Sequence, residues 1–312
     1  FRQCRHGFPP CQNYSTRKFY LRAIPYRRYG ASDAPTVVLV MGLGMSSAAW
    51  PMSLIAYLVR EGFQVITPDN RDCGESSRCM DMKADGGDIA KAVAQALMRR
   101  KVTSAYALED MALDVERLLN HLSIRRAHIA GISMGGMIAQ VAAVQSPNRI
   151  ASLTSIASAS GNPRTGLGHL KAVWTLLRKP NNIDTEEGLR NYFSRVFSTL
   201  SGPAYKPSTE ELEDMLNRLE SLHYDSDGTA RQLLAILASG DRSWQLRRIT
   251  APALVIHGTA DPLLPLAAGR ETADLIPDSR FEAIDGMGHQ LPEALVPRLA
   301  ALIAQHCHRH PA

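Results

Sequence analysis

The chain has 312 residues, of which 45% are hydrophobic and 21% charged, and its net charge is +5. This is the composition of an ordinary globular protein, and no apolar run reaches the roughly 18 residues that span a bilayer, so we expect no membrane span. The positive charge is concentrated in residues 1–32, which hold seven arginines or lysines and no acid. The other 280 residues carry a net charge of −2, which excludes the broad basic face of a nucleic-acid-binding protein.

Residues 1–32 are predicted to form a basic N-terminal arm that could contribute an edge strand to the folded body. Their basic, acid-poor composition loosely fits a transit peptide, but they lack the apolar core of a secretory signal. The five cysteines lack the paired spacing of a metal site: Cys4, Cys11, Cys73, Cys79 and Cys307. We therefore expect reduced thiols and a cytoplasmic protein.

Short apolar runs alternate with helical patterns along most of the chain. The predicted strands cover residues 36–40, 64–67, 127–130, 253–257 and 280–284. The predicted helices cover residues 50–60 and 108–122, with a shorter helical insertion at about 88–100. Since the apolar runs lack the polar alternation of a half-exposed sheet, they favour parallel strands covered on both faces. The sequence thus predicts an α/β fold with a doubly wound, mostly parallel sheet.

The alternation stops near Ser160 and resumes near Ile249, and the residues between show only helical patterns. Ser208 and Glu211 form a capping-box pattern at the start of one helix. Another helix carries an apolar stripe over three turns: Leu189, Tyr192, Phe193, Val196, Phe197 and Leu200. The predicted organisation is a catalytic domain of residues 33–159 and 246–312 with an inserted helical cap of residues 160–245.

The stretch "HIAGISMGGMIAQ", residues 128–140, places Ser133 between a predicted strand and a helix that begins at Met134. A serine at such a junction is held in a strained turn with its hydroxyl pointing out of the sheet. Gly131 and Gly135 are expected because side chains at these positions would collide where the strand and the helix cross. The pattern predicts that Ser133 is a nucleophile.

A serine hydroxyl needs a neighbouring base, and His289 is the best candidate. It lies in "AIDGMGHQLP", a glycine-rich loop after a predicted strand, and catalytic groups of open α/β sheets gather at such strand ends. The remaining histidines lie in the arm, on helical patterns, at the C-terminus or in apolar strands. For the two in strands, His128 and His257, we predict a structural role with a hydrogen-bond partner.

The base in turn needs an acid, for which Asp261 is the leading candidate. It follows a predicted strand in "HGTADPLLP", so that serine, acid and histidine occur in the order typical of this kind of site. Asp285 is the alternative, but it lies four residues from His289 and fits a loop cap better. Asp69 and Asp72 precede the serine, and we expect them to hold their own loop by hydrogen bonds to the backbone.

A tetrahedral intermediate needs hydrogen-bond donors aimed at its oxyanion. One donor is predicted to be the backbone N–H of Met134, directly after the nucleophile. The second is predicted to be the N–H of Leu43, in the loop "VLVMGLGMSS" that follows the first long strand. Gly42 and Gly44 would let this loop run close to a substrate, or would simply form a turn.

Together these motifs resemble the α/β-hydrolase superfamily, and within it the aclacinomycin methylesterase-type serine esterases. The motifs are "VMGLGMSSAAW", "PDNRDCGES", "GISMGGMIAQ", "LVIHGTADPLLP" and "GMGHQLP", in order over roughly residues 36–293. The resemblance implies a triad of Ser133, Asp261 and His289 and an oxyanion donor near Leu43. Met41 replaces the histidine that commonly opens this loop in the superfamily, although methylesterase-like members also carry Met-Gly there.

The sequence therefore predicts a carboxylesterase that needs no metal or organic cofactor and acts through an acyl-enzyme on a small-molecule ester. An apolar substrate pocket is predicted from the cap, although the same side chains could simply pack the cap helices together: Trp174, Tyr192, Phe193, Phe197 and Leu200. One alternative is a cofactor-free haloperoxidase or perhydrolase with the same triad. A second is a non-catalytic receptor for small molecules, which the intact triad disfavours.

Overall fold

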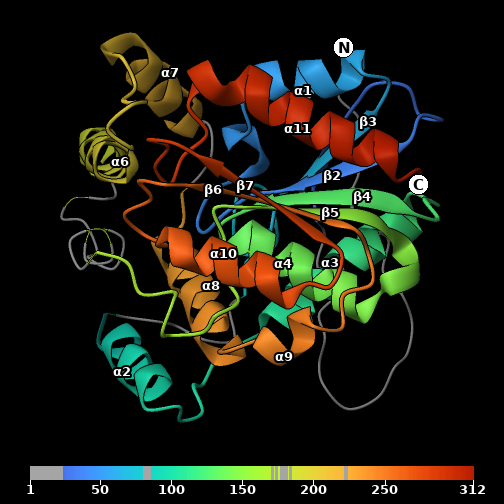
Figure 1. Ribbon diagram of the computed structural model, residues 1–312. Helices are drawn as coiled ribbons and strands as arrows, with labels where there is room; N and C mark the ends of the chain where they lie inside the picture. The colour runs from blue at the N-terminus through green and yellow to red at the C-terminus, as the bar shows by residue number, and fades with distance from the viewer. Residues whose placement is uncertain are drawn as a thin grey trace.

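The computed structural model describes residues 24–79, 86–169, 172, 175, 182, 185–220 and 224–312. Its centre is a seven-stranded sheet in the order β1-β3-β2-β4-β5-β6-β7 (Figure 1). The strands are β1 (Tyr26–Tyr29), β2 (Thr36–Val40), β3 (Gln64–Pro68), β4 (Ala127–Ile132), β5 (Ile150–Ile156), β6 (Ala253–Gly258) and β7 (Ser279–Ile284). The edge strand β1 pairs with β3 in antiparallel fashion, and all other neighbouring strands are parallel. The predicted doubly wound, mostly parallel sheet is confirmed.

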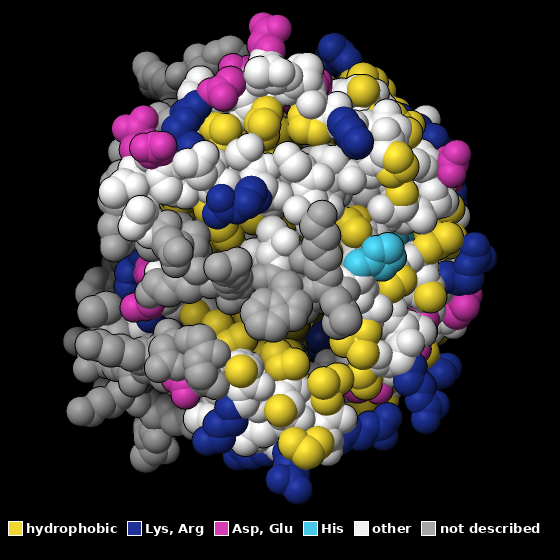
Figure 2. All heavy atoms as spheres, turned by 90° about the vertical axis from the view of Figure 1, so that its left-hand side faces the viewer, with side chains coloured by type: hydrophobic (Ala, Val, Ile, Leu, Met, Phe, Trp, Pro, Cys, Tyr) yellow, Lys and Arg dark blue, Asp and Glu magenta, His cyan; other side chains and the backbone are white. Residues whose placement is uncertain are grey.

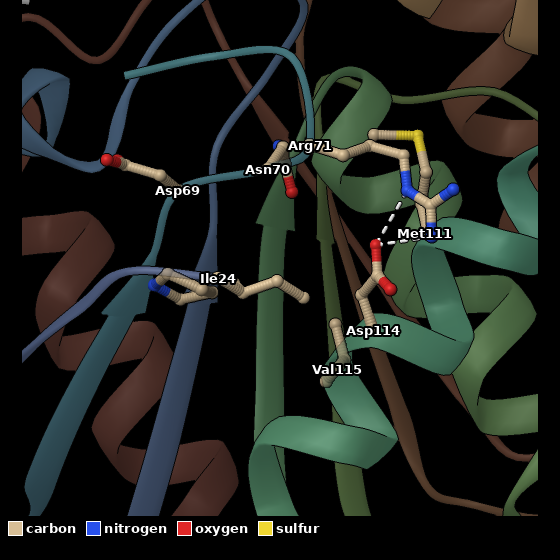
Figure 3. A pocket seen from close by; sticks show the side chains of 8 residues that line it. Ile24, Asp69, Asn70, Arg71, Met111, Asp114 and Val115 are labelled. Carbon is tan, nitrogen blue, oxygen red and sulfur yellow. Dashed lines mark hydrogen bonds and ion pairs between the residues drawn. The ribbon is translucent and has the colours of Figure 1, made fainter. Parts of the chain in front are cut away.

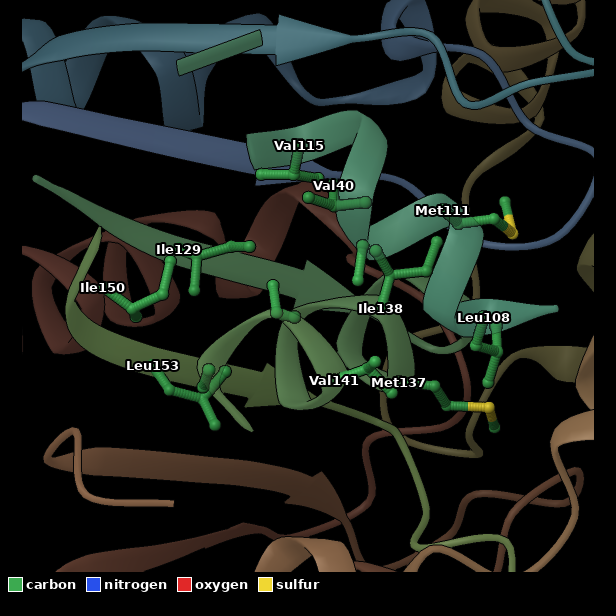
Figure 4. Close-up of a cluster of buried hydrophobic side chains, with 14 of the residues drawn as sticks. Val40, Leu108, Met111, Val115, Ile129, Met137, Ile138, Val141, Ile150 and Leu153 are labelled. Carbon is green, nitrogen blue, oxygen red and sulfur yellow. The ribbon is translucent and has the colours of Figure 1, made fainter. Parts of the chain in front are cut away.

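Helices cover both faces of the sheet. On one face lie α1 (Met52–Arg60) and α11 (Val296–Arg309), and on the other lie α3 (Leu108–His121), α4 (Met134–Gln145) and α10 (Leu266–Leu275). Successive side chains of a strand point to opposite faces, so β2 sends Val38 and Val40 into one core and Val37 and Leu39 into the other. Figure 4 shows the first core, between strands β4 and β5 and helices α3 and α4. This double burial explains why the four residues Val37–Val40 are all apolar, with no polar alternation between the two faces.

Strand β5 was not predicted, because polar residues interrupt its sequence IASLTSI. All seven of its residues are nevertheless buried. Ser152 lies 2.8 Å from Nδ1 of His128, and Ser155 accepts a hydrogen bond of 3.0 Å from Gln140. These partners are distant in the sequence, so no local pattern could show that polar side chains here would be satisfied inside the core.

Among the described residues between β5 and β6 lie the helices α6 (Glu186–Leu200), α7 (Thr209–Glu220), α8 (Ser226–Ser239) and the short α9 (Ser243–Leu246). The capping box before α7 is formed as the sequence predicts, with reciprocal backbone contacts of 2.7 and 3.1 Å between Ser208 and Glu211. The helix α2 (Gly86–Leu97), between β3 and α3, packs against α8. In the described part of the chain, no helix has both the length and the apolarity needed to cross a membrane.

Candidate active site

Ser133 lies at the turn between β4 and α4. Its backbone has φ 55° and ψ −122°, in a region that L-residues rarely adopt and that costs of order 1–3 kcal/mol. The surrounding structure holds the turn from two sides, since Ser133 N–H donates to the Ile156 carbonyl at 2.9 Å and the Ser133 carbonyl accepts from the Ser158 hydroxyl at 2.8 Å. The strained turn that the sequence predicts is therefore present.

The glycines on either side of the serine are required by close backbone contacts. A Cβ atom on Gly131 would lie 2.1 Å from the carbonyl oxygen of Gly135, and one on Gly135 would lie 2.1 Å from that of Val40 in β2. A Cβ atom on Gly42 would meet the Ser133 Cβ atom at 3.3 Å. The start of α4 can thus pack directly against two strands, and the loop after β2 passes over the serine.

His289 lies in the loop after β7, beside Ser133. Its Nε2 atom is 2.9 Å from the Ser133 Oγ atom, and its Nδ1 atom is 2.7 Å from Oδ2 of Asp261. The backbone N–H of His289 donates to the carbonyl of Leu200, the last residue of α6, at 2.8 Å. The loop that carries the imidazole is thereby fastened to a helix of the predicted cap.

Asp261 is buried in the loop after β6 and is held by four polar contacts. Its Oδ1 atom accepts the backbone N–H groups of Leu263 and Leu264, each at 2.9 Å, and its Oδ2 atom faces His289 and, at 3.5 Å, His257. Burial alone would raise the pKa of Asp261, but the charge and hydrogen bond of His289 hold this pKa below its ordinary value. The carboxylate therefore stays ionised and accepts the Nδ1–H proton, which leaves Nε2 free to accept the serine proton. The alternative acid, Asp285, accepts a hydrogen bond of 3.0 Å from Thr259 at an exposed position.

The loop of residues 41–47, which we call the oxyanion loop, contains Leu43 and passes over the serine. The Met41 carbonyl accepts from the Asn70 side chain, and the Gly44 N–H donates to the Gln232 side chain, each at 2.8 Å. Within the described part of the chain, neither the Leu43 N–H nor the Met134 N–H has a hydrogen-bond acceptor. Both are therefore available as donors to a bound oxyanion.

A cavity of about 300 Å³ opens above Ser133 and His289. Of the predicted pocket residues, Tyr192, Phe193, Phe197 and Leu200 all line it, whereas Trp174 lies outside the described residues. Among the described residues that line the cavity, none is Asp, Glu, Lys or Arg. Figure 2 shows this side of the molecule, where hydrophobic side chains reach the surface between charged ones. The cavity is thus suited to an uncharged, largely apolar group.

Comparison with known protein families finds one that matches most of this chain. A model of the α/β-hydrolase fold family matches residues 35–293. The chain belongs to this family. Among the described residues of this α/β hydrolase, no group of three or more His, Cys, Asp or Glu side chains is arranged to hold a metal ion.

Two relatives and one solved structure show the range of proteins that this α/β hydrolase is similar to. It is 29% identical over 298 residues to rhodomycin D methylesterase DnrP of Streptomyces peucetius, covering 88% of this chain and 91% of that protein. It is 25% identical to a non-heme chloroperoxidase of Streptomyces lividans, covering 89% and 95%. The enol-lactonase structure from Burkholderia xenovorans LB400 superposes with a TM-score of 0.65 at 26% identity, covering 91% and 95%. The resemblance to α/β hydrolases of the methylesterase type, predicted from the motifs, is confirmed.

The sequence did not reveal how α8 reaches the active-site loops of this α/β hydrolase. As predicted, Asp69 binds the backbone of its own loop, at Glu75 N–H, but it also accepts the Ser47 N–H of the oxyanion loop at 2.8 Å. Asp72 is fully buried and forms a bidentate ion pair with Arg231 of α8. The partners of this pair are 159 residues apart, so no spacing in the sequence could have indicated it.

Two further histidines are buried and neutral, which makes the stability of this α/β hydrolase pH-dependent. Burial lowers the pKa of His128, in β4, and of His306, in α11, to about 4 from 6.5. Below pH 6.5 the unfolded chain binds protons that the folded chain does not, so the free energy of unfolding falls as the pH drops from about 6.5 to about 4. The loss is expected to reach at most ~3 kcal/mol for each histidine.

Urea unfolding of the wild type and His128→Asn at pH 7.5, 5.5 and 4.5 measures this effect. We expect the variant to lose stability less steeply with falling pH than the wild type. His169→Gln, at an exposed position, is the control and should keep the wild-type slope. An equal slope in wild type and His128→Asn would contradict the prediction.

Proposed function

We propose that this α/β hydrolase is a serine-dependent carboxylic ester hydrolase that acts through an acyl-enzyme. The observation that carries the proposal is the chain of contacts from Asp261 through His289 to Ser133 at the floor of an uncharged cavity. Aligned serine, imidazole and carboxylate groups activate a hydroxyl that is otherwise a weak nucleophile at neutral pH.

In the proposed mechanism, Ser133 Oγ attacks the ester carbonyl carbon while Nε2 of His289 takes the hydroxyl proton. The N–H groups of Leu43 and Met134 donate to the oxyanion that forms. The intermediate collapses, His289 returns the proton to the leaving alcohol, and the acyl group remains on Ser133. A water molecule then gives a proton to His289 and attacks the acyl carbonyl; the bond to Ser133 Oγ breaks, His289 returns the proton to Oγ, and the acid is released. Asp261 stabilises the imidazolium in both halves of the cycle.

We propose small to medium apolar esters as substrates. A cavity of about 300 Å³ without Asp, Glu, Lys or Arg in its described lining cannot compensate a charged acyl or alcohol group. Tyr192 and Tyr224 add polar atoms to the lining, and burial raises the pKa of both phenols, so they act as neutral hydrogen-bonding groups. The methylesterase relative, whose name specifies a methyl ester, is consistent with a neutral ester.

We also propose that the chain is organised as the sequence predicts. Residues 33–159 and 246–312 would form the catalytic domain, and residues 160–245 the cap that selects the substrate. Support comes from the residues that line the cavity, since Phe193 and Phe197 come from α6, whereas Ser133 and His289 come from the loops at the strand ends.

A series of p-nitrophenyl esters of rising acyl chain length tests the function. We expect a burst of p-nitrophenol equal to the enzyme concentration, a preference for neutral acyl groups of short to medium length, and no turnover of acyl groups that end in a carboxylate. Intact mass spectrometry of the wild type should detect the added acyl group, digestion should place it on a peptide containing Ser133, and Ser133→Ala should lack it. Full hydrolysis by Ser133→Ala would contradict the proposal.

A cofactor-free perhydrolase or haloperoxidase is the second candidate, because a non-heme chloroperoxidase is among the relatives. In that reaction hydrogen peroxide, rather than water, would attack the acyl-enzyme and release a peracid, which then oxidises a halide. Bromination assayed with peroxide, acetate and bromide, compared with ester hydrolysis by the same sample, distinguishes the two. Bromination faster than hydrolysis of every ester in the series would favour the second candidate.

A further inference from the structure

We propose that Gln232, on α8, is a positioning residue that holds the oxyanion loop in the geometry in which Leu43 N–H can donate to an oxyanion. The proposal rests on the proposed ester hydrolysis and assigns α8 a part in the chemical step as well as in substrate selection. Gln232 lies 99 positions after the nucleophile in the sequence, and its side chain is fully buried.

The side chain of Gln232 connects two active-site loops. Its Oε1 atom accepts the backbone N–H of Gly44 at 2.8 Å, and its Nε2 atom donates to the backbone carbonyl of Arg71 at 2.7 Å. Both contacts are made to the main chain, so they fix the course of the two loops and not merely a side-chain rotamer. A buried amide with both ends satisfied has one favoured orientation, because turning it over would face N–H against N–H and oxygen against oxygen.

The carbonyl to which Gln232 donates is itself held firmly. The Arg71 guanidinium forms an ion pair with Asp114 of α3, with an Nη2–Oδ2 distance of 2.6 Å, and donates to the Asp110 carbonyl at 2.9 Å. Figure 3 shows the Arg71 side chain turned towards Asp114, while Asp69 points away from it toward another part of the fold. The Gln232 amide is therefore supported by a residue that is fixed to the main body of the sheet and its helices.

The helix α8, which carries Gln232, is held by an ion pair of the neighbouring residue, and it packs directly on the oxyanion loop. Arg231 forms the buried bidentate pair with Asp72. A Cβ atom on Gly44 would lie 2.7 Å from the hydroxyl oxygen of Thr229, one turn earlier on α8. Gly44 also has φ 68°, a conformation that favours glycine. A glycine at position 44 therefore lets α8 pack directly against the loop.

The oxyanion loop is held by hydrogen bonds on both sides of Leu43, whose N–H is the proposed donor. Asn70 holds the Met41 carbonyl on one side of Leu43, and Gln232 holds the Gly44 N–H on the other. Loss of the second anchor would let the Leu43 N–H move by a fraction of an ångström, which is enough to weaken a preorganised oxyanion contact. Substrate binding in the apolar cavity depends much less on this donor, because the negative charge on the oxygen develops only on the way to the tetrahedral intermediate.

The experiment compares Gln232→Leu, which loses both contacts, with Gln232→Glu, which can still accept the Gly44 N–H but loses the donor. With p-nitrophenyl butyrate we expect kcat of Gln232→Leu to fall about 10- to 100-fold while KM changes less than about 3-fold. Gln232→Glu should lie between Gln232→Leu and the wild type. If Gln232→Leu does not fold, Gln232→Glu replaces it in the test, and we again expect kcat to fall more than KM changes.

The matched control is Gln140→Leu, another fully buried glutamine, which lies on α4 and donates to the Ser155 hydroxyl at 3.0 Å. It should change thermal stability without lowering kcat. Equal losses of kcat in Gln140→Leu and Gln232→Leu, or an effect of Gln232→Leu on KM alone, would overturn the assignment. This outcome differs from failure of the proposed function, in which the wild type itself would neither hydrolyse esters nor form an acyl adduct.

Discussion

Asp261→Asn is expected to lower kcat for ester hydrolysis by about 10⁴-fold while the fold stays intact. The reason lies in the two backbone N–H groups of Leu263 and Leu264, which donate to Oδ1 of the carboxylate. In the variant these donors would hold the amide oxygen at the Oδ1 position, so the amide NH₂ would face His289. The imidazole would then carry its proton on Nε2 and could no longer accept one from Ser133.

Steady-state kinetics on an activated ester, together with far-UV circular dichroism, would test this prediction. Asp285→Asn is the matched control, because Asp285 is the other carboxylate near His289 in the sequence and its Oδ1 atom contacts Thr259. We expect Asp285→Asn to retain kcat within about 3-fold, since an exposed hydrogen bond contributes little. If Asp285→Asn loses as much activity as Asp261→Asn, the assignment of Asp261 as the acid is wrong.

The features that the sequence predicts correctly are those formed by contiguous residues or by the ends of parallel strands. The turn at Ser133 could be predicted because the strand, the turn and the start of α4 are contiguous, so its glycines and apolar runs are all visible in one stretch. Asp261 and His289 could be predicted because parallel strands bring their carboxyl ends to one edge of the sheet. The order of the strands therefore indicates that Asp261 and His289 lie close to Ser133, although they are far from it in the sequence.

The contacts of α8 could not be predicted in the same way. Arg231 and Gln232 appear in the sequence as two polar residues on a helix, a pattern that is typical of a solvated face. Whether such side chains are exposed or buried depends on partners in β3–α2 and in the oxyanion loop, more than 150 residues away. Strand β5 illustrates the same limit, because its two serine side chains are buried against hydrogen-bond partners on β4 and α4.

Arg231→Met is expected to lower the free energy of unfolding by about 3–5 kcal/mol, because it leaves the Asp72 carboxylate buried without its counter-ion. The side chains of Arg231 and Asp72 are 5% and 0% exposed, and their two contacts measure 3.0 and 3.1 Å. Burial alone would lower the pKa of Arg231, but Asp72 raises it above the ordinary value, so the guanidinium stays charged. Asp225 contacts the same guanidinium at 3.4 Å but is more exposed, so its carboxylate loses less than that of Asp72 when the arginine is removed.

Urea unfolding at pH 7.5 measures the loss, and Arg298→Met serves as the control. Arg298 pairs with Glu282 at 2.7 Å but is 49% exposed, so its removal should cost no more than about 1 kcal/mol. The double variant Arg231→Met with Asp72→Asn should recover part of the stability, because it removes the unpaired charge along with its partner. If Arg231→Met costs no more than Arg298→Met, the ion pair does not fasten α8 to the sheet. The hold of Gln232 on the oxyanion loop would then depend on the packing of α8 alone.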